Sequence, residues 1–215
     1  MNRLFLQIIL LLASSQLLAQ DADPLWLRYP AISPDGQNIV FTYKGDLYSV
    51  SSAGGKAYPL TLHNAHEFMP VWSKDSKQIA FASNRYGNYD VFILPAEGGK
   101  ATRLTYHSAN DYPSDFSADQ NHIVFSSSRL DAKTNQQFPS GTLPELYQVP
   151  TAGGRVHQLL TTAAQDARCS QDGQLIVFHD RKGYEDPFRK HHTSTVTRDL
   201  WRYKTQTPIK KAYTT

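Results

Sequence analysis

Cysteine is nearly absent from this sequence of 215 residues, in which Cys169 is the only one. A single cysteine forms no internal disulfide and supplies neither a cysteine-based metal site nor a Cys-x-x-Cys redox pair. We expect Cys169 to be a small buried hydrophobe beside a turn. A strong charge of one sign is also lacking, because 22 Lys and Arg face 19 Asp and Glu, a net charge of +3. No basic cluster alternates with stacking aromatics, so nucleic-acid binding is not expected.

Long apolar runs and helical periodicity are scarce beyond the first twenty residues. Residues 4–12 are apolar except for Gln7, they follow the positive charge of Arg3, and Ala19 offers a small residue for cleavage. This pattern is typical of a secretory signal peptide, which we place at residues 1–19. The alternative is a buried or membrane-spanning helix, but the stretch is short for a bilayer core of about 30 Å. The sequence therefore predicts an exported, periplasmic chain that is not held in the membrane after cleavage.

The most informative feature is a nonapeptide that occurs four times. It reads Ser-Pro-Asp-Gly-Gln-Asn-Ile-Val-Phe from Ser33, and related copies begin at Ser73, Ser117 and Ser170, at spacings of 40, 44 and 53 residues. Pro, Asp and Gly are turn residues, and the β-branched and aromatic residues after them are typical of a buried strand. A period of this length indicates stacked supersecondary units whose loops differ in length.

Other elements recur with the nonapeptide. Each copy is followed by a second apolar pair, and three of the four units then carry a glycine pair and end in Leu-Thr. Strand, turn, strand, hairpin, strand, glycine turn and strand make four antiparallel strands, which is one blade of a β-propeller. We therefore predict an all-β fold, a β-propeller of four-stranded antiparallel blades. About four blades are present within residues 20–215, as units 26–61, 69–105, 112–161 and 166–215.

One acid precedes the second apolar pair in every unit: Asp46, Asp90, Glu145 and Asp199. Their common register favours a role in capping backbone groups or in joining strands. Arg85 and Arg129 follow their strands closely. We expect these two arginines to pair with those acids.

The sequence offers little support for a metal site or for a catalytic arrangement of side chains. His63, His66 and Glu67 could suggest a metal site, but a loop between strands fixes no ligand geometry, so a solvated loop is favoured. A carboxylate enzyme built on Asp111 and Asp115 has little support, because these acids recur as repeat features. No Gly-x-Ser-x-Gly nucleophile elbow occurs. We therefore assign no catalytic residue, no metal site and no cofactor.

The hairpin of the fourth unit, residues 181–199, is the most unusual stretch, with basic, histidine and aromatic residues close together. The third unit expands the same hairpin, so we expect this material on one face of the disc, where propellers form contacts. A solvated crossover or an inter-domain contact is one interpretation. The other is a patch that lines the disc face or the channel and comprises Arg189, Lys190, His191, His192 and Arg198.

The segment from Tyr184 to Trp201 is more specific than the repeat. Its Phe-Arg-Lys-His-His run ahead of Thr-Arg-Asp-Leu-Trp resembles the corresponding stretch of the tricorn-type serine proteases, in their bacterial, exported branch. The repeat alone is shared with TolB-like and prolyl-peptidase propellers. The resemblance covers nearly everything after the signal peptide. The resemblance implies a serine-type peptidase, that is, a hydrolase that acts in proteolysis, whose PDZ and protease domains lie downstream. It assigns no catalytic residue to this chain.

Two functions remain open. The first is the N-terminal propeller segment of a tricorn-like serine peptidase, gating or guiding peptide substrates to a protease core that this chain lacks. The second is a stand-alone TolB-like periplasmic propeller that binds a protein partner by its disc face or channel. Closed propellers of this repeat type commonly have six or more blades, so four units predict an incomplete ring. The first function then implies a fragment, whose partners are further blades and the PDZ and protease domains of a longer chain.

Overall fold

The computed structural model describes residues 26–129, 143–180, 199–204 and 210–211. Within these ranges the chain forms four antiparallel sheets of four strands each. The first two sheets comprise β1 (Arg28–Ile32), β2 (Asn38–Tyr43), β3 (Asp46–Ser51), β4 (Tyr58–Pro59), β5 (Glu67–Trp72), β6 (Gln78–Ser83), β7 (Asp90–Pro95) and β8 (Thr102–Arg103). The other two comprise β9 (Asp111–Phe116), β10 (His122–Ser127), β11 (Glu145–Pro150), β12 (His157–Leu160), β13 (Gln165–Cys169), β14 (Leu175–His179), β15 (Leu200–Lys204) and β16 (Lys210–Lys211).

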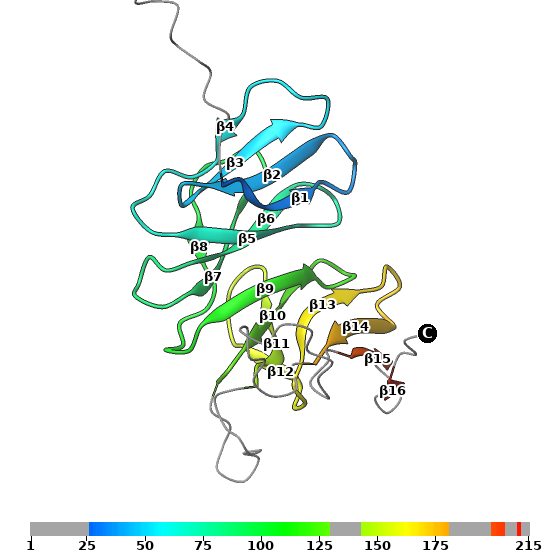
Figure 1. Ribbon diagram of the computed structural model, residues 1–215. Helices are drawn as coiled ribbons and strands as arrows, with labels where there is room; N and C mark the ends of the chain where they lie inside the picture. Colours follow the sequence, from blue (N-terminus) through cyan, green and yellow to red (C-terminus); the bar gives the residue numbers. More distant parts are fainter. Residues whose placement is uncertain (1–25, 130–142, 181–198, 205–209, 212–215) are drawn as a thin grey trace, which may run out of the picture.

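Each sheet keeps its strands in chain order, and the sheets follow one another in an arc (Figure 1). The first strands β1, β5, β9 and β13 contact one another in that order, whereas the short fourth strands lie at the far edge of each sheet. The first strands therefore lie around the axis and the fourth strands at the rim. This arrangement confirms the predicted propeller of four-stranded antiparallel blades. No described residue belongs to a helix that is long and apolar enough to cross a membrane, and the predicted signal peptide lies outside the described residues.

The nonapeptide forms the turn between the first and second strands of each blade. In the first copy the Ser33 hydroxyl donates a hydrogen bond of 2.5 Å to Asp35 and accepts one of 2.9 Å from the backbone N–H of Asn38. The serines of the other three copies make the same two bonds. The fourth position has a left-handed backbone in every copy, with φ of 73° at Gly36, 60° at Ser76, 61° at Gln120 and 70° at Gly173. Glycine accepts this conformation without a Cβ penalty.

The core lies between neighbouring blades. The apolar residues of the second strands alternate, so that Ala80 packs against the third blade while Ile79 and Phe81 pack against the first. The same alternation places Val124 against Ile176 and Phe178 of the fourth blade. Because successive side chains of a strand point to opposite faces, each blade contributes to two interfaces.

The two ends of the arc carry apolar faces that no described blade covers. Leu200 is 50% exposed, although its equivalents Leu47, Val91 and Leu146 are each 0% exposed. At the other end Ile32 is 61% exposed, although its equivalents Trp72 and Phe116 are 7% and 0% exposed. The four blades thus form an incomplete ring, as the sequence predicts.

The predicted partners of Arg85 and Arg129 are wrong. Arg85 Nε lies 2.7 Å from Glu67 Oε1, and Arg129 Nη2 lies 2.5 Å from Asp111 Oδ2. Glu67 and Asp111 begin the first strands, opposite the last residues of β6 and β10, so each arginine reaches across to them from just beyond its strand. Asp90 binds Arg103 instead, at 2.7 Å. Of the four acids in register, Asp46 has the predicted capping role, because it accepts the backbone N–H of His63 at 2.9 Å. Asp90 and Glu145 join strands, which is the other predicted role: Asp90 binds Arg103 of β8, and Glu145 accepts a hydrogen bond of 2.7 Å from Gln158 of β12.

Candidate functional site

The predicted patch of Arg189, Lys190, His191, His192 and Arg198 lies outside the described residues. The hairpins that join the second and third strands all leave the blades at one end, which we call the hairpin face. Ser127 opposite Glu145 and His179 opposite Leu200 mark the points where the two expanded hairpins attach to it. The nonapeptide turns occupy the opposite end, which we call the turn face.

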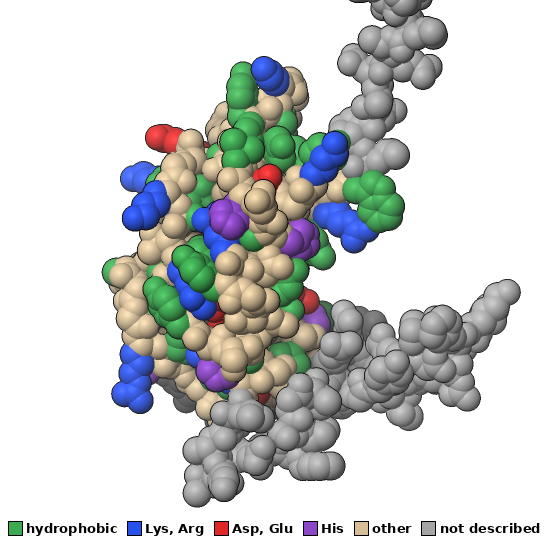
Figure 2. Space-filling view, turned by 90° about the vertical axis from the view of Figure 1, so that its left-hand side faces the viewer, with side chains coloured by type: hydrophobic (Ala, Val, Ile, Leu, Met, Phe, Trp, Pro, Cys, Tyr) green, Lys and Arg blue, Asp and Glu red, His purple; other side chains and the backbone are tan. Residues whose placement is uncertain are grey.

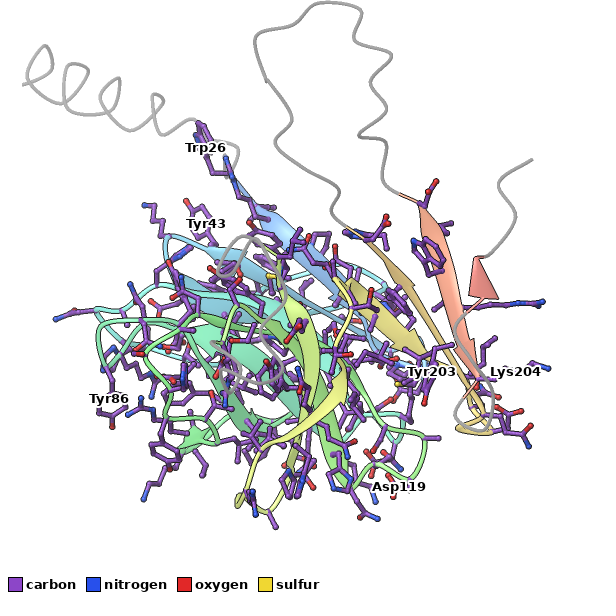
Figure 3. All side chains as sticks on the ribbon, turned by 90° about the horizontal axis from the view of Figure 1, so that it is seen from below. Trp26, Tyr43, Tyr86, Asp119, Tyr203 and Lys204 are labelled. Atoms are coloured by element: carbon purple, nitrogen blue, oxygen red, sulfur yellow. The ribbon has the colours of Figure 1, made fainter. Side chains whose placement is uncertain are left out.

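The two faces differ in chemistry. Three acids of the hairpin face, Glu67, Asp90 and Asp111, are each 0% exposed. The turn face instead presents exposed carboxylates, one from each nonapeptide: Asp35, Asp75, Asp119 and Asp172. Figure 2 views the hairpin face and shows Lys, Arg and His among hydrophobic side chains, with little acidic surface. In Figure 3, Tyr43 and Tyr86 lie on the side of the hairpin face and Asp119 on the side of the turn face.

An aromatic cluster joins the first three blades near the axis. Phe68 of β5 lies 5.3 Å from the Tyr29 ring of β1 and 5.9 Å from the Tyr112 ring of β9. His66 stacks on Phe68 at 5.1 Å, and its Nδ1 lies 3.1 Å from the Tyr89 hydroxyl. Burial, and then the neighbouring Tyr89, raise the pKa of Tyr112, so its hydroxyl stays protonated.

Every first strand carries an irregularity about halfway along. The pairing register shifts in β1, β5, β9 and β13, and the shift coincides with left-handed φ values of 52° at Tyr29, 53° at Met69 and 49° at Asp166. Such bulges re-aim side chains, and left-handed residues other than glycine cluster at functional sites. The bulges therefore mark the inner strands as the candidate site.

A cavity of about 550 Å³ lies along these bulges, and the first strands of all four blades line it. Its walls differ in character. Blades one and two contribute mostly apolar groups, including Tyr29, Met69 and Val71, whereas blades three and four contribute Ser114, Asp166 and Arg168. We call this cavity the axial channel.

Most charged groups of the axial channel are paired. Lys74 Nζ lies 3.0 Å from both oxygens of Asp115, which also accepts the backbone N–H groups of Phe116 and Cys169 at 2.8 Å. His179 Nε2 lies 2.5 Å from Asp166 Oδ2. Burial, and then the nearby Asp115, raise the pKa of the Cys169 thiol to about 11. Little of the thiol is therefore ionised at neutral pH. Cys169 packs against the core between the third and fourth blades, as predicted for a hydrophobe, but it is partly buried and not fully buried.

The bulges were not predicted, although the sequence carries a signal for them. Tyr29-Pro30 and Met69-Pro70 both end three residues before the serine of their nonapeptide, and Asp166-Ala167 occupies the same place in the fourth blade. Proline lacks a backbone N–H and suits a strand whose inner edge has no partner. In the third blade Ser114 is one extra residue between the proline and the serine, which disguises the pattern.

The histidines of the inter-blade loops have a structural role. His63 Nδ1 accepts the backbone N–H of Ala65, and His107 Nδ1 accepts that of Ala109, both at 3.0 Å. Glu67 is occupied by Arg85. Among the residues that the structure describes, no group of three His, Cys, Asp or Glu side chains could hold a metal ion.

Comparison with known proteins extends this description. The family described as "Tricorn protease N-terminal beta propeller domain" matches residues 24–214. Tricorn protease homolog 1 of Streptomyces coelicolor is 35% identical over 76 residues, which are 35% of this chain and 7% of that relative.

Solved structures show the same fold. The tricorn protease superposes with a TM-score of 0.64 at 15% identity, over 86% of this chain and 22% of that one. TolB from Acinetobacter baumannii superposes with a TM-score of 0.62 at 17% identity, over 86% of this chain and 43% of that one. The chain thus spans less than half the length of each of these relatives.

Proposed function

Since the chain belongs to the family of tricorn protease N-terminal propellers, we propose that it is the N-terminal propeller segment of a tricorn-like serine peptidase. In this role it guides peptide substrates along the axial channel towards a protease core, and it carries out no chemistry itself. The observation that carries the proposal is the lining of this channel by the first strands of all four blades, each of which has a shift in its pairing register. A channel about 550 Å³ in volume accommodates an extended peptide segment rather than a folded domain.

The exposed ends of the arc support a longer ring. Ile32 and Leu200 are 61% and 50% exposed, and further blades of a longer chain would cover both faces. Exposed apolar surface of this kind marks an interaction site. We propose that further blades, followed by PDZ and protease domains, are the partners of this segment.

Export belongs to the same proposal. Residues 1–19 have the charge, apolar core and small residue of a signal peptide, and residues 20–215 form the exported propeller segment. We propose a periplasmic location for the mature chain.

The guiding role is tested by peptide hydrolysis with the protein encoded by the complete reading frame. Replacing Met69 with Trp narrows the axial channel, and Ala53→Trp, in an exposed turn, is the matched control. Guiding predicts that M69W slows hydrolysis of long peptides more than hydrolysis of dipeptides, while A53W leaves both rates unchanged. Equal rates for both variants and all lengths would contradict it.

A stand-alone TolB-like binding propeller is the second candidate. It is favoured by the shared fold with TolB and by the lack of a nucleophile elbow in the sequence. It predicts that the complete reading frame encodes no peptidase and that the protein binds a partner stably without cleaving it.

A further inference from the structure

A second cavity lies on the turn face, between the first and second blades. Its volume is about 850 Å³, which is within the range of about 300–1,000 Å³ that is usual for small-molecule sites. The first blade lines it with residues of β3, the glycine turn and β4, and the second blade lines it with Trp72 and with Ser76 and Lys77 of the nonapeptide. We call this cavity the inter-blade groove.

The inter-blade groove contains a serine where the next interface has a large apolar residue. Ser49 comes two residues after Leu47 in β3, and Ile93 comes two residues after Val91 in β7, so Ser49 and Ile93 occupy equivalent positions. Ile93 is 6% exposed and belongs to the same core cluster as Phe116 of the third blade. Serine is smaller than isoleucine and carries a hydroxyl group. The space between the first two blades therefore stays open and has a polar wall.

The polar side chains of the inter-blade groove have few partners within the protein. The Ser49 hydroxyl and the Asn38 amide form no hydrogen bond with another described residue. Lys56, Lys77 and Glu97 also line the groove, and none of them forms an ion pair in the described part of the chain. Hydroxyl, amide, ammonium and carboxylate groups together supply both donors and acceptors. The groove thus offers many hydrogen bonds without a strong charge of one sign.

Apolar surface lies beside these polar groups. Trp72 is 7% exposed, and its Nε1 donates to the carbonyl oxygen of Ala31 at 3.0 Å, so the polar atom of the indole is already used. Leu60 packs against the same core cluster as Trp72 and lines the groove with it. Tyr58 of β4 is 61% exposed, and Lys56 Nζ lies 5.6 Å from its ring centroid. The groove therefore has an apolar floor and an exposed aromatic ring in its wall.

We infer that the inter-blade groove binds a short, uncharged oligosaccharide. Sugar hydroxyls both donate and accept hydrogen bonds, which matches the mixed polar groups of the groove. The C–H face of a sugar ring is apolar and packs against aromatic side chains, which matches Tyr58 and the floor at Trp72 and Leu60. The inference is independent of the guiding role, because the groove lies between two blades and not along the axis.

The test measures binding of maltotriose, cellotriose and tri-N-acetylchitotriose to the 215-residue chain by saturation-transfer difference NMR. We expect at least one of these trisaccharides to bind with a dissociation constant of about 1 mM or lower. Inorganic phosphate is titrated in parallel by isothermal titration calorimetry, because an anion is the ligand that the lysines Lys56 and Lys77 would favour instead.

The second blade supplies the substitutions that locate the site. Ser49→Ile introduces the residue type of Ile93, fills the groove, and should abolish binding while it raises the unfolding temperature. Tyr58→Thr introduces the residue type of the equivalent Thr102 and should weaken binding about tenfold. Ser52→Ala, in an exposed turn outside the groove, is the matched control and should change neither quantity. Thermal unfolding of each variant verifies that it folds.

Three results would overturn the inference. It is wrong if none of the trisaccharides binds. It is also wrong if a trisaccharide binds the S49I variant as tightly as the unsubstituted chain, because the sugar then lies elsewhere. If only inorganic phosphate binds, and S49I abolishes that binding, the groove is an anion site. None of these results changes the test of the guiding role with M69W.

Discussion

The serine that opens each nonapeptide holds its turn through a single hydroxyl group. Ser73, which is 1% exposed, donates to Asp75 at 2.7 Å and accepts the backbone N–H of Gln78 at 2.8 Å. The donated hydrogen bond is the main reason why the pKa of the Asp75 carboxyl lies below its usual value. The pKa values of the equivalent carboxyl groups are lowered for the same reason, in Asp35, Asp119 and Asp172. One hydroxyl thus links the turn geometry to the charge of the turn face.

Replacing Ser73 with Ala should destabilise the chain at pH 7 by about 1 kcal/mol, since it removes the acceptor of the partly buried backbone N–H of Gln78. Because the folded-state pKa of Asp75 is lowered, the associated stability is present above the unfolded value of about 4. It is lost as the pH falls through the folded-state pKa, so the effect of the substitution should be smaller there. Urea unfolding at pH 7 and at a pH below the folded-state pKa of Asp75 measures the loss of stability under each condition. Ser52→Ala is the control. An identical loss at both pH values would contradict the role assigned to the Ser73–Asp75 bond.

The left-handed position of the turn gives a matched pair of glycines. Gly36 and Gly173 have φ of 73° and 70°, but an added Cβ meets nothing within 4 Å at Gly36 and Ala118 Cβ at 3.2 Å at Gly173. Gly36→Ala should cost about 1 kcal/mol through backbone strain alone. Gly173→Ala should cost more, and Ala118→Gly should restore only the excess. Chemical denaturation of the two single glycine variants and of the double variant Gly173→Ala with Ala118→Gly checks this, and equal costs at both glycines would refute the crowding.

At the scale of the strands, a buried carboxylate joins the first strand of the second blade, and another that of the third, to the hairpin beside it. Asp111 begins β9 and is 0% exposed, and the Arg129 guanidinium that binds it lies 5.1 Å from the Phe125 ring and 5.3 Å from the Tyr147 ring. Removing one partner of such a pair leaves the other charge buried and without a counter-ion. Asp90 behaves differently, because burial raises its pKa despite the nearby Arg103.

Arg129→Met should destabilise the third blade by about 3 kcal/mol, because Asp111 loses its cation while the aromatic contact is retained. The double variant with Asp111→Asn should recover part of this loss. Equilibrium unfolding of both variants, with Arg155→Met as control, measures the difference. If the double variant loses as much as both single changes together, Asp111 and Arg129 do not act as a pair.

The strands themselves could be predicted from the sequence, whereas the channel could not. Ile39, Val40 and Phe41 and their counterparts alternate between two faces, and the turn residues before them fix where each strand starts. The first strands have a weaker signal, because bulges at Tyr29, Met69 and Asp166 interrupt their alternation. The partners of Arg85 and Arg129 depend on pairing between strands that are separated by a turn, so the nearest acids in the repeat register were misleading.

At the scale of the whole molecule, the arc buries apolar residues between blades and leaves them exposed at its ends. Leu146 and Leu200 occupy equivalent positions with exposed fractions of 0% and 50%. The same residue type at the same place in the blade therefore contributes differently to stability. The difference in exposed fraction between Leu146 and Leu200 shows how much surface the next blade covers.

Leu146→Ala should destabilise the chain by about 2–5 kcal/mol, since it leaves a cavity in the interface of the third and fourth blades. Leu200→Ala should cost about 1 kcal/mol or less, because the side chain is already half in water. Urea unfolding of the two variants compares them directly. Equal losses would show that a surface covers Leu200 in this chain.

The most direct measurement of the incomplete ring is thiol reactivity at its two ends. Cys169 has a pKa raised to about 11, so the unsubstituted chain provides a low background at neutral pH. Ile32→Cys and Leu200→Cys place new thiols on the exposed end faces. We predict that both react with a maleimide at the rate of an unprotected thiol in the 215-residue chain, and that both are protected in the protein encoded by the complete reading frame. Protection of both thiols in the 215-residue chain at high dilution would show that four blades close upon themselves, and it would contradict the account.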